Sequence, residues 1–229
     1  MFNRRNCIII SSVIPAFNIE MTPSFLEMDK NFSSLLYTSL IENMSEIAAA
    51  SPDNLPSIIL LVEADRNSIL KDEESVFENS NIFFDSADVS DHLNSQGAHW
   101  NTIIIKGNAI GLEVKDFTFI TGKLDPDIKT VLVFSTAKGQ LVAVASGALT
   151  FEELIEPVIQ GFDNEQTLKH FSKYDVQLQS LTKGIVIEDK EDFRKLYDFL
   201  STKQSIPYCS QKIHEKFTEV FIEFKSLLH

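Results

Sequence analysis

The chain has 229 residues, of which 44% are hydrophobic and 23% are charged, and its net charge at pH 7 is −13. This length and composition allow a single large domain with a sizeable hydrophobic core. A surface this acidic repels nucleic acid and anionic lipid, so we exclude nucleic acid and membranes as general partners.

The N-terminal part of the chain predicts two buried strands and a long helix. Residues 7–14 and 57–62 are mostly apolar runs that predict strands, and residues 15–30 predict a long loop. Residues 31–50 predict a helix, because apolar side chains recur along them at helical spacing. That stripe consists of Phe32, Leu36, Leu40, Met44 and Ile47. Residues 65–79 predict a second, polar helix.

The central stretch, residues 102–148, predicts the interior of a sheet. Its apolar runs lie at 103–105, 131–134 and 141–145. Strands without polar alternation are buried on both faces, which favours a mostly parallel sheet covered by helices. Open sheets of this kind bind ligands at the carboxyl ends of their strands. We therefore expect a site, if there is one, around residues 106–112 and 135–140.

The remaining elements complete an α/β pattern. Thr150-Phe-Glu-Glu153 is a capping box, which predicts the start of a helix. Further strands are expected at 82–84, 176–181 and 184–187, a short helix or turn at 88–96, and further helices at 113–123, 164–174, 190–203 and 210–228. Without an internal repeat or an obvious linker, the chain reads as one α/β domain over residues 1–229. Its core spans residues 7–200, and residues 204–229 add a C-terminal helix.

Two acidic groups are candidate metal ligands, and each has a simpler structural interpretation. Asp125 and Asp127 flank a proline at a spacing that could hold a divalent cation, but they lie at the amino end of the sheet, where a solvated turn is favoured. Asp85, Asp88, Asp91 and His92 could also ligate a metal. Acidic residues in the first turn of a helix complement its dipole, and we favour that role here.

Other residues with potential chemistry give no specific signal. Trp100 could stack on a base or sugar, although a position in the core is favoured. Cys7 and Cys209 have no paired spacing, which predicts reduced structural thiols in a cytoplasmic protein. The chain contains no Walker loop, no G-x-G-x-x-G and no G-x-S-x-G.

Four segments keep the order and approximate spacing of a known set of motifs. Residues 88–93 fall on D-L-G-E-R-M, 106–112 on G-x-D-x-P-G-L, 134–145 on G-P-A-x-D-G-G-Y-Y-L-I-G and 187–193 on V-D-T-P-E-D-L. This set resembles the bacterial nucleotide-diphospho-sugar transferase-like proteins of the glycosyltransferase-A fold. The resemblance covers roughly residues 7–200. It implies a three-layer α/β fold, with a mostly parallel central sheet, helices on both faces and a helical C-terminal elaboration.

The phosphate-binding loop implied by the resemblance departs from the family pattern P-x-x-G-x-x-K-T-R-L. Pro15 and Thr22 match it. Asn18 stands where the family has Gly, Met21 where it has Lys, and Pro23 where it has Arg. The two missing cations are those that would neutralise the phosphates of a nucleotide.

The strand-end motifs depart from the family pattern as well. Asn108 stands for the Asp expected to hold a metal, and an amide cannot supply the negative charge that a cation needs. Lys138 replaces the Asp of the D-G-G-Y-Y-L motif. Gly111, Leu112 and Gly139 match, and these are positions that shape the fold. The scaffold is therefore expected to be kept, while the chemistry is stripped or rebuilt.

Together these observations predict a nucleotide-diphospho-sugar transferase-like protein that is catalytically degenerate or has altered chemistry. Whether it is an enzyme stays open. The candidate crevice residues are Pro15, Thr22, Asp88, Lys106, Asn108, Lys138 and Gly139. We expect no cofactor, no divalent metal site and at most weak binding of a nucleotide sugar.

Two alternatives remain at this stage. The chain could be a non-catalytic binding or scaffolding protein that uses the old crevice or a Phe-rich surface to hold a protein partner or a second copy of itself. It could also be an active transferase in which Lys106 or Lys138 supplies positive charge instead of a metal.

Overall fold

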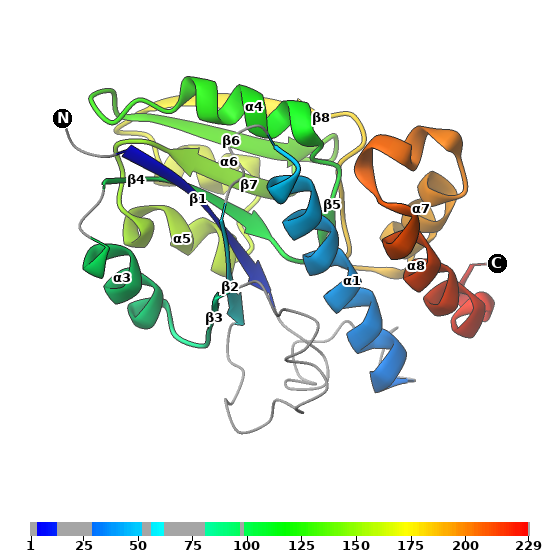
Figure 1. The fold of residues 1–229 in the computed structure, drawn as a ribbon. Helices are drawn as coiled ribbons and strands as arrows, with labels where there is room; N and C mark the ends of the chain where they lie inside the picture. The colour runs from blue at the N-terminus through cyan, green and yellow to red at the C-terminus, as the bar shows by residue number, and fades with distance from the viewer. Residues whose placement is uncertain (1–3, 13–28, 52–55, 62–80, 97–98, 229) are drawn as a thin grey trace.

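The computed structural model describes residues 4–12, 29–51, 56–61, 81–96 and 99–228, and its centre is a seven-stranded sheet (Figure 1). The strands lie in the order β3-β2-β1-β4-β7-β6-β8. Their bounds are β1 Arg4–Ser12, β2 Ser57–Leu61, β3 Asn81–Phe83, β4 His99–Lys106, β6 Thr130–Thr136, β7 Leu141–Ser146 and β8 Asp175–Leu181. The strands predicted near residues 7, 57, 102 and 131 therefore share one sheet.

The sheet is mostly parallel, as expected, and β7 is its reversed strand. β1 pairs in parallel with β2 and β4, β2 with β3, and β6 with β8, whereas β7 runs antiparallel to both β4 and β6. All six residues of β7 are buried, so its sequence looks like that of its parallel neighbours. The reversal places Leu141, at the start of β7, beside the carboxyl ends of β4 and β6.

Helices cover both faces of the sheet, which confirms the three-layer architecture. Their bounds are α1 Lys30–Ala49, α3 Ser86–Ser95, α4 Val114–Lys123, α5 Phe151–Ile159 and α6 Asn164–His170. Successive residues of β1 point to opposite layers. Ile8 packs in a core with Phe117 of α4 and Met44 of α1, while Ile9 packs in a second core with Leu154 of α5.

A third core joins the C-terminal helices to the outer side of α1, as Figure 1 shows at the right of the molecule. Phe193 of α7 (Lys190–Leu200) and Phe217 of α8 (Gln211–Glu223) pack with Leu40 of α1. Lys216 Nζ of α8 also donates to Glu42 Oε2 of α1 at 2.5 Å. This part of the chain is the helical C-terminal elaboration that the resemblance implied.

Three C-terminal helices are shorter than the sequence predicted. α6 ends at His170 rather than residue 174, because the backbone N–H of Asp175 donates to Lys129 O and so enters the sheet. α7 ends at Leu200 rather than residue 203, because both the N–H and the hydroxyl of Thr202 donate to Phe199 O.

The last helix is also shorter than expected. α8 begins at Gln211, after a 3₁₀ segment over Lys203–Tyr208, and the N-cap hydroxyl of Ser210 accepts from the N–H of Ile213. It ends at Glu223, and residues Lys225–Leu227 form one further 3₁₀ turn.

A second, two-stranded sheet lies beside the main one. β5 (Ala109–Ile110) pairs antiparallel with β9 (Ile185–Val186). Gly111, which follows β5, has φ +122°, a conformation that favours glycine. A Cβ atom at Gly111 would lie 2.5 Å from Gly184 Cα, so the two segments of the chain are in close backbone contact there.

Some expected elements fall outside the described residues. These are the helix at 65–79 and the loop that contains Pro15 and Thr22. Among the helices that the structure describes, none is both long and apolar enough to cross a membrane.

Replacing Gly111 with alanine should destabilise the fold. The new Cβ would lie 2.7 Å from Lys183 O, and the backbone would keep a strained positive φ. We expect Gly111→Ala to lower the free energy of unfolding by about 1–3 kcal/mol, measured by urea denaturation followed by circular dichroism.

Gly122→Ala is the matched control. A Cβ at Gly122 meets nothing within 4 Å, and the residue lies in α4. Because alanine favours a helix over glycine, this change should raise the free energy of unfolding by about 0.5–1 kcal/mol. Equal stability of the two variants would contradict the close approach at Gly111.

Candidate functional site

The carboxyl edge of the main sheet gathers polar residues from two strands and the turn that follows one of them. β4 ends at Lys106 and β6 at Thr136, and β7 begins at Leu141, so residues 137–140 form the turn between β6 and β7 at this edge. Gly139 has φ +84° in that turn, and its N–H donates to Thr136 O at 3.0 Å. This is the edge at which open α/β sheets bind ligands.

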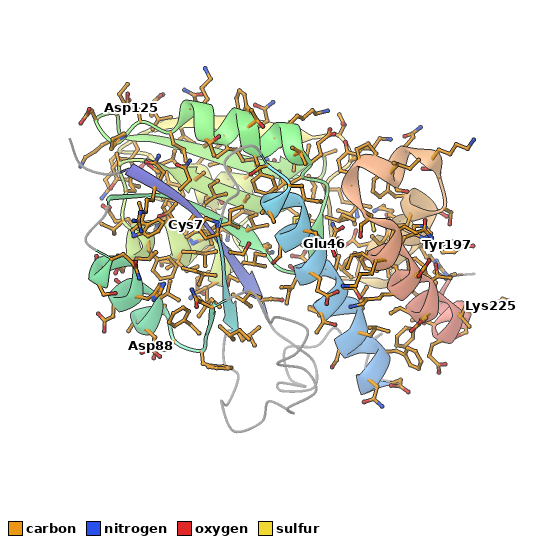
Figure 2. All side chains as sticks on the ribbon, in the orientation of Figure 1. Cys7, Glu46, Asp88, Asp125, Tyr197 and Lys225 are labelled. Atoms are coloured by element: carbon orange, nitrogen blue, oxygen red, sulfur yellow. The ribbon has the colours of Figure 1, made fainter. Side chains whose placement is uncertain are left out.

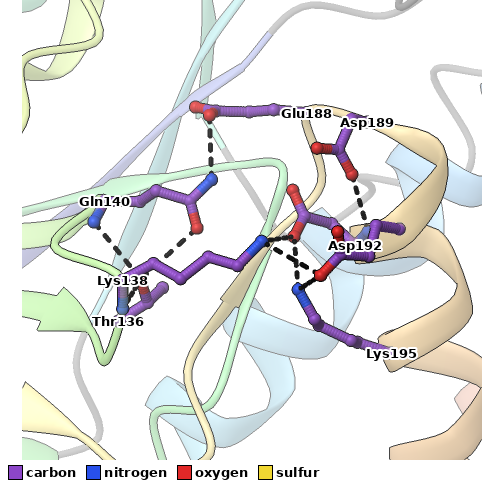
Figure 3. A network of polar contacts seen from close by, with 8 residues as sticks. Thr136, Lys138, Gln140, Glu188, Asp189, Asp192 and Lys195 are labelled. Atoms are coloured by element: carbon purple, nitrogen blue, oxygen red, sulfur yellow. Dashed lines mark hydrogen bonds and ion pairs between the residues drawn. The ribbon is translucent and has the colours of Figure 1, made fainter.

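The Thr136 side chain fixes the turn. Its hydroxyl oxygen accepts from the backbone N–H groups of Lys138 and Gln140, each at 3.2 Å. The hydroxyl also donates to Gln140 Oε1 at 3.3 Å. The Gln140 side chain is thereby held with its amide nitrogen available to a neighbouring group (Figure 3).

That neighbouring group is Glu188, which the small sheet brings to this edge. Gln140 Nε2 donates to Glu188 Oε2 at 2.9 Å, and Lys106 Nζ donates to Glu188 Oε1 at 3.0 Å. The two charges differ in solvation, because the Lys106 side chain is 11% exposed and the Glu188 side chain is 46% exposed. Lys106 therefore depends on Glu188 more than Glu188 depends on Lys106.

A second ion-pair group lies at the start of α7. Lys138 Nζ lies 3.3 Å from Asp192 Oδ1 and 3.5 Å from Glu191 Oε1. Lys195 Nζ lies 2.6 Å from the same Glu191 oxygen and 3.4 Å from Asp192 Oδ1. The hydrogen bond from Lys195, together with the charge of Lys138, lowers the pKa of Glu191 below its ordinary value. Figure 3 shows Lys138 reaching from its turn to this helix.

Asp192 is the buried centre of this group. Its side chain is 3% exposed. Its backbone N–H donates to Asp189 Oδ1 at 2.8 Å, so Asp189 caps the helix. Asp192 Oδ1 accepts from both lysines, while Oδ2 has no hydrogen-bond partner among the described residues.

The charges of this edge are balanced. The cations are Lys106, Lys138 and Lys195, and the carboxylates paired with them are Glu188, Glu191 and Asp192. Each cation is therefore already engaged by a carboxylate of the 188–192 segment. A phosphate group entering here would compete with those carboxylates for the same lysines.

The structure brings together some of the predicted crevice residues and separates others. Lys106, Lys138 and Gly139 lie at the carboxyl edge described above. Asp88 lies in the first turn of α3, beside β3, which is three strand positions from β4. Figure 2 labels Asp88 on the side of the molecule away from the C-terminal helices.

Asn108 has a structural role in the small sheet. Its Nδ2 donates to Ile187 O at 3.0 Å, and its own carbonyl accepts from the N–H of Ile187 at 2.9 Å. The Asn108 amide thus holds the chain just before Glu188. An aspartate at this position would set a negative oxygen against the Ile187 carbonyl.

Several residues of the network were not singled out from the sequence. They are Glu188, Glu191, Asp192 and Lys195, whereas Thr136 and Gln140 lie in the stretch 135–140 at which a site was expected. The available signal was the acidic run at 188–192, which falls on the tail motif of the resemblance. Its distance in sequence from residues 106 and 138 concealed the pairing.

The other sequence candidates have local structural roles. Asp125 Oδ1 accepts from the N–H of Asp127 at 2.9 Å, which forms a turn. Asp85 caps α3 by accepting from the N–H of Ala87 at 2.8 Å. Trp100 is half-buried, and its indole N–H donates to Leu93 O at 3.0 Å. No group of three or more potential metal-ligating residues gathers within the described part of the chain.

Comparison with known proteins establishes the fold. No protein-family model matches the chain, and no curated protein matches its sequence. A protein from Desulfovibrio desulfuricans G20, provisionally named a nucleotide-diphospho-sugar transferase, has a TM-score of 0.65 at 10% identity, covering 97% of this chain and 96% of that one. A cytidylyltransferase from Leptospira borgpetersenii serovar Hardjo-bovis strain JB197 has a TM-score of 0.58 at 12% identity, covering 99% and 97%.

These identities are low, so the likeness concerns the fold alone. The chain has the nucleotide-sugar transferase-like α/β fold that its motif order implied. The likeness extends over 97% and 99% of this chain in the two comparisons.

The unequal burial of Lys106 and Glu188 predicts unequal effects of their removal. Glu188→Ala leaves a buried ammonium without its partner and should lower the free energy of unfolding by about 1–3 kcal/mol. Lys106→Met keeps the aliphatic packing and leaves a carboxylate that water can solvate, so its cost should be about 0–1 kcal/mol.

Urea denaturation at pH 7 measures both variants, and the double variant completes the cycle. With Lys106 gone, removing Glu188 should add little further loss. A larger loss for Lys106→Met than for Glu188→Ala would contradict the dependence of the buried cation on Glu188.

Proposed function

We propose that this chain is a catalytically degenerate nucleotide-diphospho-sugar transferase-like protein that binds nucleotide sugars weakly. The fold supports the nucleotide-sugar part of the proposal. The observation that carries the degenerate part is the pairing of Lys106, Lys138 and Lys195 with carboxylates of the 188–192 segment.

Electrostatics explains why such a crevice binds a nucleotide sugar weakly. A diphosphate brings two negative charges to a protein whose net charge is −13. To reach Lys106 it must displace Glu188, and to reach Lys138 it must compete with Glu191 and Asp192. The chain thus offers the ligand a sheet edge at which Lys106 and Lys138 are already paired with carboxylates.

The amide of Asn108 also disfavours metal-dependent transfer. A hard divalent cation needs several oxygen ligands with negative charge among them. The Asn108 amide is neutral and is engaged with Ile187 O. We therefore propose that the chain needs no divalent metal. Lys106 and Lys138 are each paired with a carboxylate, which also disfavours an active transferase in which these lysines replace the metal.

A cytoplasmic location is part of the proposal. Cys7 and Cys209 are both buried and not joined in a disulfide. Burial raises the pKa of each thiol to about 12, so neither is a reactive thiolate at neutral pH. Such thiols are typical of proteins in reducing compartments.

A non-catalytic binding or scaffolding role is the second candidate. The same balanced charges favour it, because a crevice closed by its own ion pairs need not bind any nucleotide. The two candidates differ in whether releasing the lysines creates a nucleotide-sugar site.

Isothermal titration with a panel of nucleotide sugars, with and without manganese, tests the first candidate. We expect dissociation constants of about 1 mM or weaker for the unmodified protein. The double variant Glu188→Gln with Glu191→Gln removes two exposed carboxylates that engage the lysines. Releasing these charge-assisted contacts should tighten binding by about tenfold or more.

The control variant carries Glu219→Gln with Glu223→Gln, two exposed residues of α8. It changes the net charge by the same amount away from the crevice and should leave the affinity unchanged. Low micromolar binding of a nucleotide sugar by the unmodified protein would refute the proposal that the chain is catalytically degenerate. No gain in the crevice variant would favour the scaffolding role.

A further inference from the structure

The outer edge of β8 is an unprotected strand edge. β8 (Asp175–Leu181) is the last strand of the sheet and pairs in parallel with β6 along all seven residues. No further strand lies beyond it among the residues that the structure describes. Edge strands of this length are ready templates for pairing with another chain.

Alternate backbone groups of β8 point away from the sheet. The N–H of Asp175 donates to Lys129 O, which sets the phase of the ladder. Successive residues direct their N–H and C=O groups to opposite sides of a strand. The residues whose groups point to the outside are Val176, Leu178 and Ser180.

The side chains of β8 lack the usual protection of an edge. Residues 176–181 contain neither a charge nor a proline, and Asp175 is the single charged residue of the strand. Leu178 is 45% exposed at its centre. Natural edge strands are commonly blocked by charged residues, proline or a bulge. The pairing of β8 with β6 shows no register shift.

We propose that β8 is a homodimerisation edge, at which two copies of this chain pair antiparallel about a two-fold axis at Leu178. In this register Leu178 lies opposite the partner's Leu178, and Val176 lies opposite the partner's Ser180. These are the outward-pointing residues, so the N–H and C=O groups of each pair face each other. The two sheets become one continuous sheet.

The strand fits a second copy of itself, which decides the choice of partner. On one face the pairing sets Leu178 against the partner's Leu178, which removes exposed apolar surface from water. On the other face Gln177 lies opposite the partner's Gln179, so amide meets amide. For a chain of net charge −13, self-association is favoured at a surface that adds no repulsion, and residues 176–181 carry no charge.

The register is also determined. A shift by one residue would place the outward-pointing residues of one strand opposite partner residues whose backbone groups point toward β6. A shift by two would leave fewer residue pairs within the strand. A closed two-fold pairing occupies the β8 edge of each copy, so no β8 edge is left for a third copy and the contact gives a dimer rather than a fibre. Because a single strand pair is a small interface, the dissociation constant should be on the order of micromolar.

Sedimentation equilibrium of the unmodified protein and of charge variants at the axis tests the proposal. Leu178→Lys and Leu178→Asp each place like charges opposite one another and should weaken dimerisation by about tenfold or more. A 1:1 mixture of the two variants should restore the dimer, because lysine then faces aspartate. Leu168→Lys, at a similarly exposed leucine of α6, should leave dimerisation unchanged.

Residue-resolved hydrogen exchange gives an independent signature. The amides of Val176, Leu178 and Ser180 should become protected as the protein concentration rises, while those of Gln177 and Gln179 should be protected at every concentration. Circular dichroism melting checks that each variant is folded. A monomer up to about 100 µM overturns the proposal. So does a dimer that Leu178→Lys leaves intact, or one that Leu168→Lys weakens equally.

Discussion

The pairing of β5 with β9 is the constraint on which the candidate site depends. Ala109 lies opposite Val186 and Ile110 opposite Ile185, so the chain after β9 must run beside the end of β4. The Asn108 side chain continues this pairing by donating to Ile187 O. Glu188 is the next residue and reaches Lys106. One short antiparallel ladder thus carries the acidic segment to the lysines.

This arrangement turns a cationic edge into a neutral one. A buried ammonium such as that of Lys106 requires a carboxylate, because removing an unpaired charge from water is costly. Glu188 supplies the carboxylate from the protein itself. In the pair at α7 the burial is reversed, because the Asp192 side chain is 3% exposed and that of Lys138 is 47% exposed. In a crevice that held an anionic ligand, the ligand would supply that charge. The ion pairs therefore neutralise this edge with groups of the chain itself.

The fold survives at 10–12% identity because it depends on burial rather than on particular residues. Core positions such as Ile104 and Val144 must be apolar and of suitable volume, and many sequences satisfy that condition. A polar site tolerates fewer substitutions, since each donor needs an acceptor within about 3 Å. Low identity can therefore leave a sheet intact without preserving the polar contacts at its edge.

The sequence by itself determined the buried strands, the order of the elements and the helix cap at Thr150. Runs such as residues 103–105 are stable only between two covered faces, and the capping box at Thr150 is a local signal that the structure confirms. Only the tertiary structure decided that β7 is reversed and that Lys106 pairs with Glu188, 82 residues away. A strand buried on both faces carries no mark of its direction, and an ion pair between distant segments leaves no periodic pattern, so neither could be predicted from local sequence.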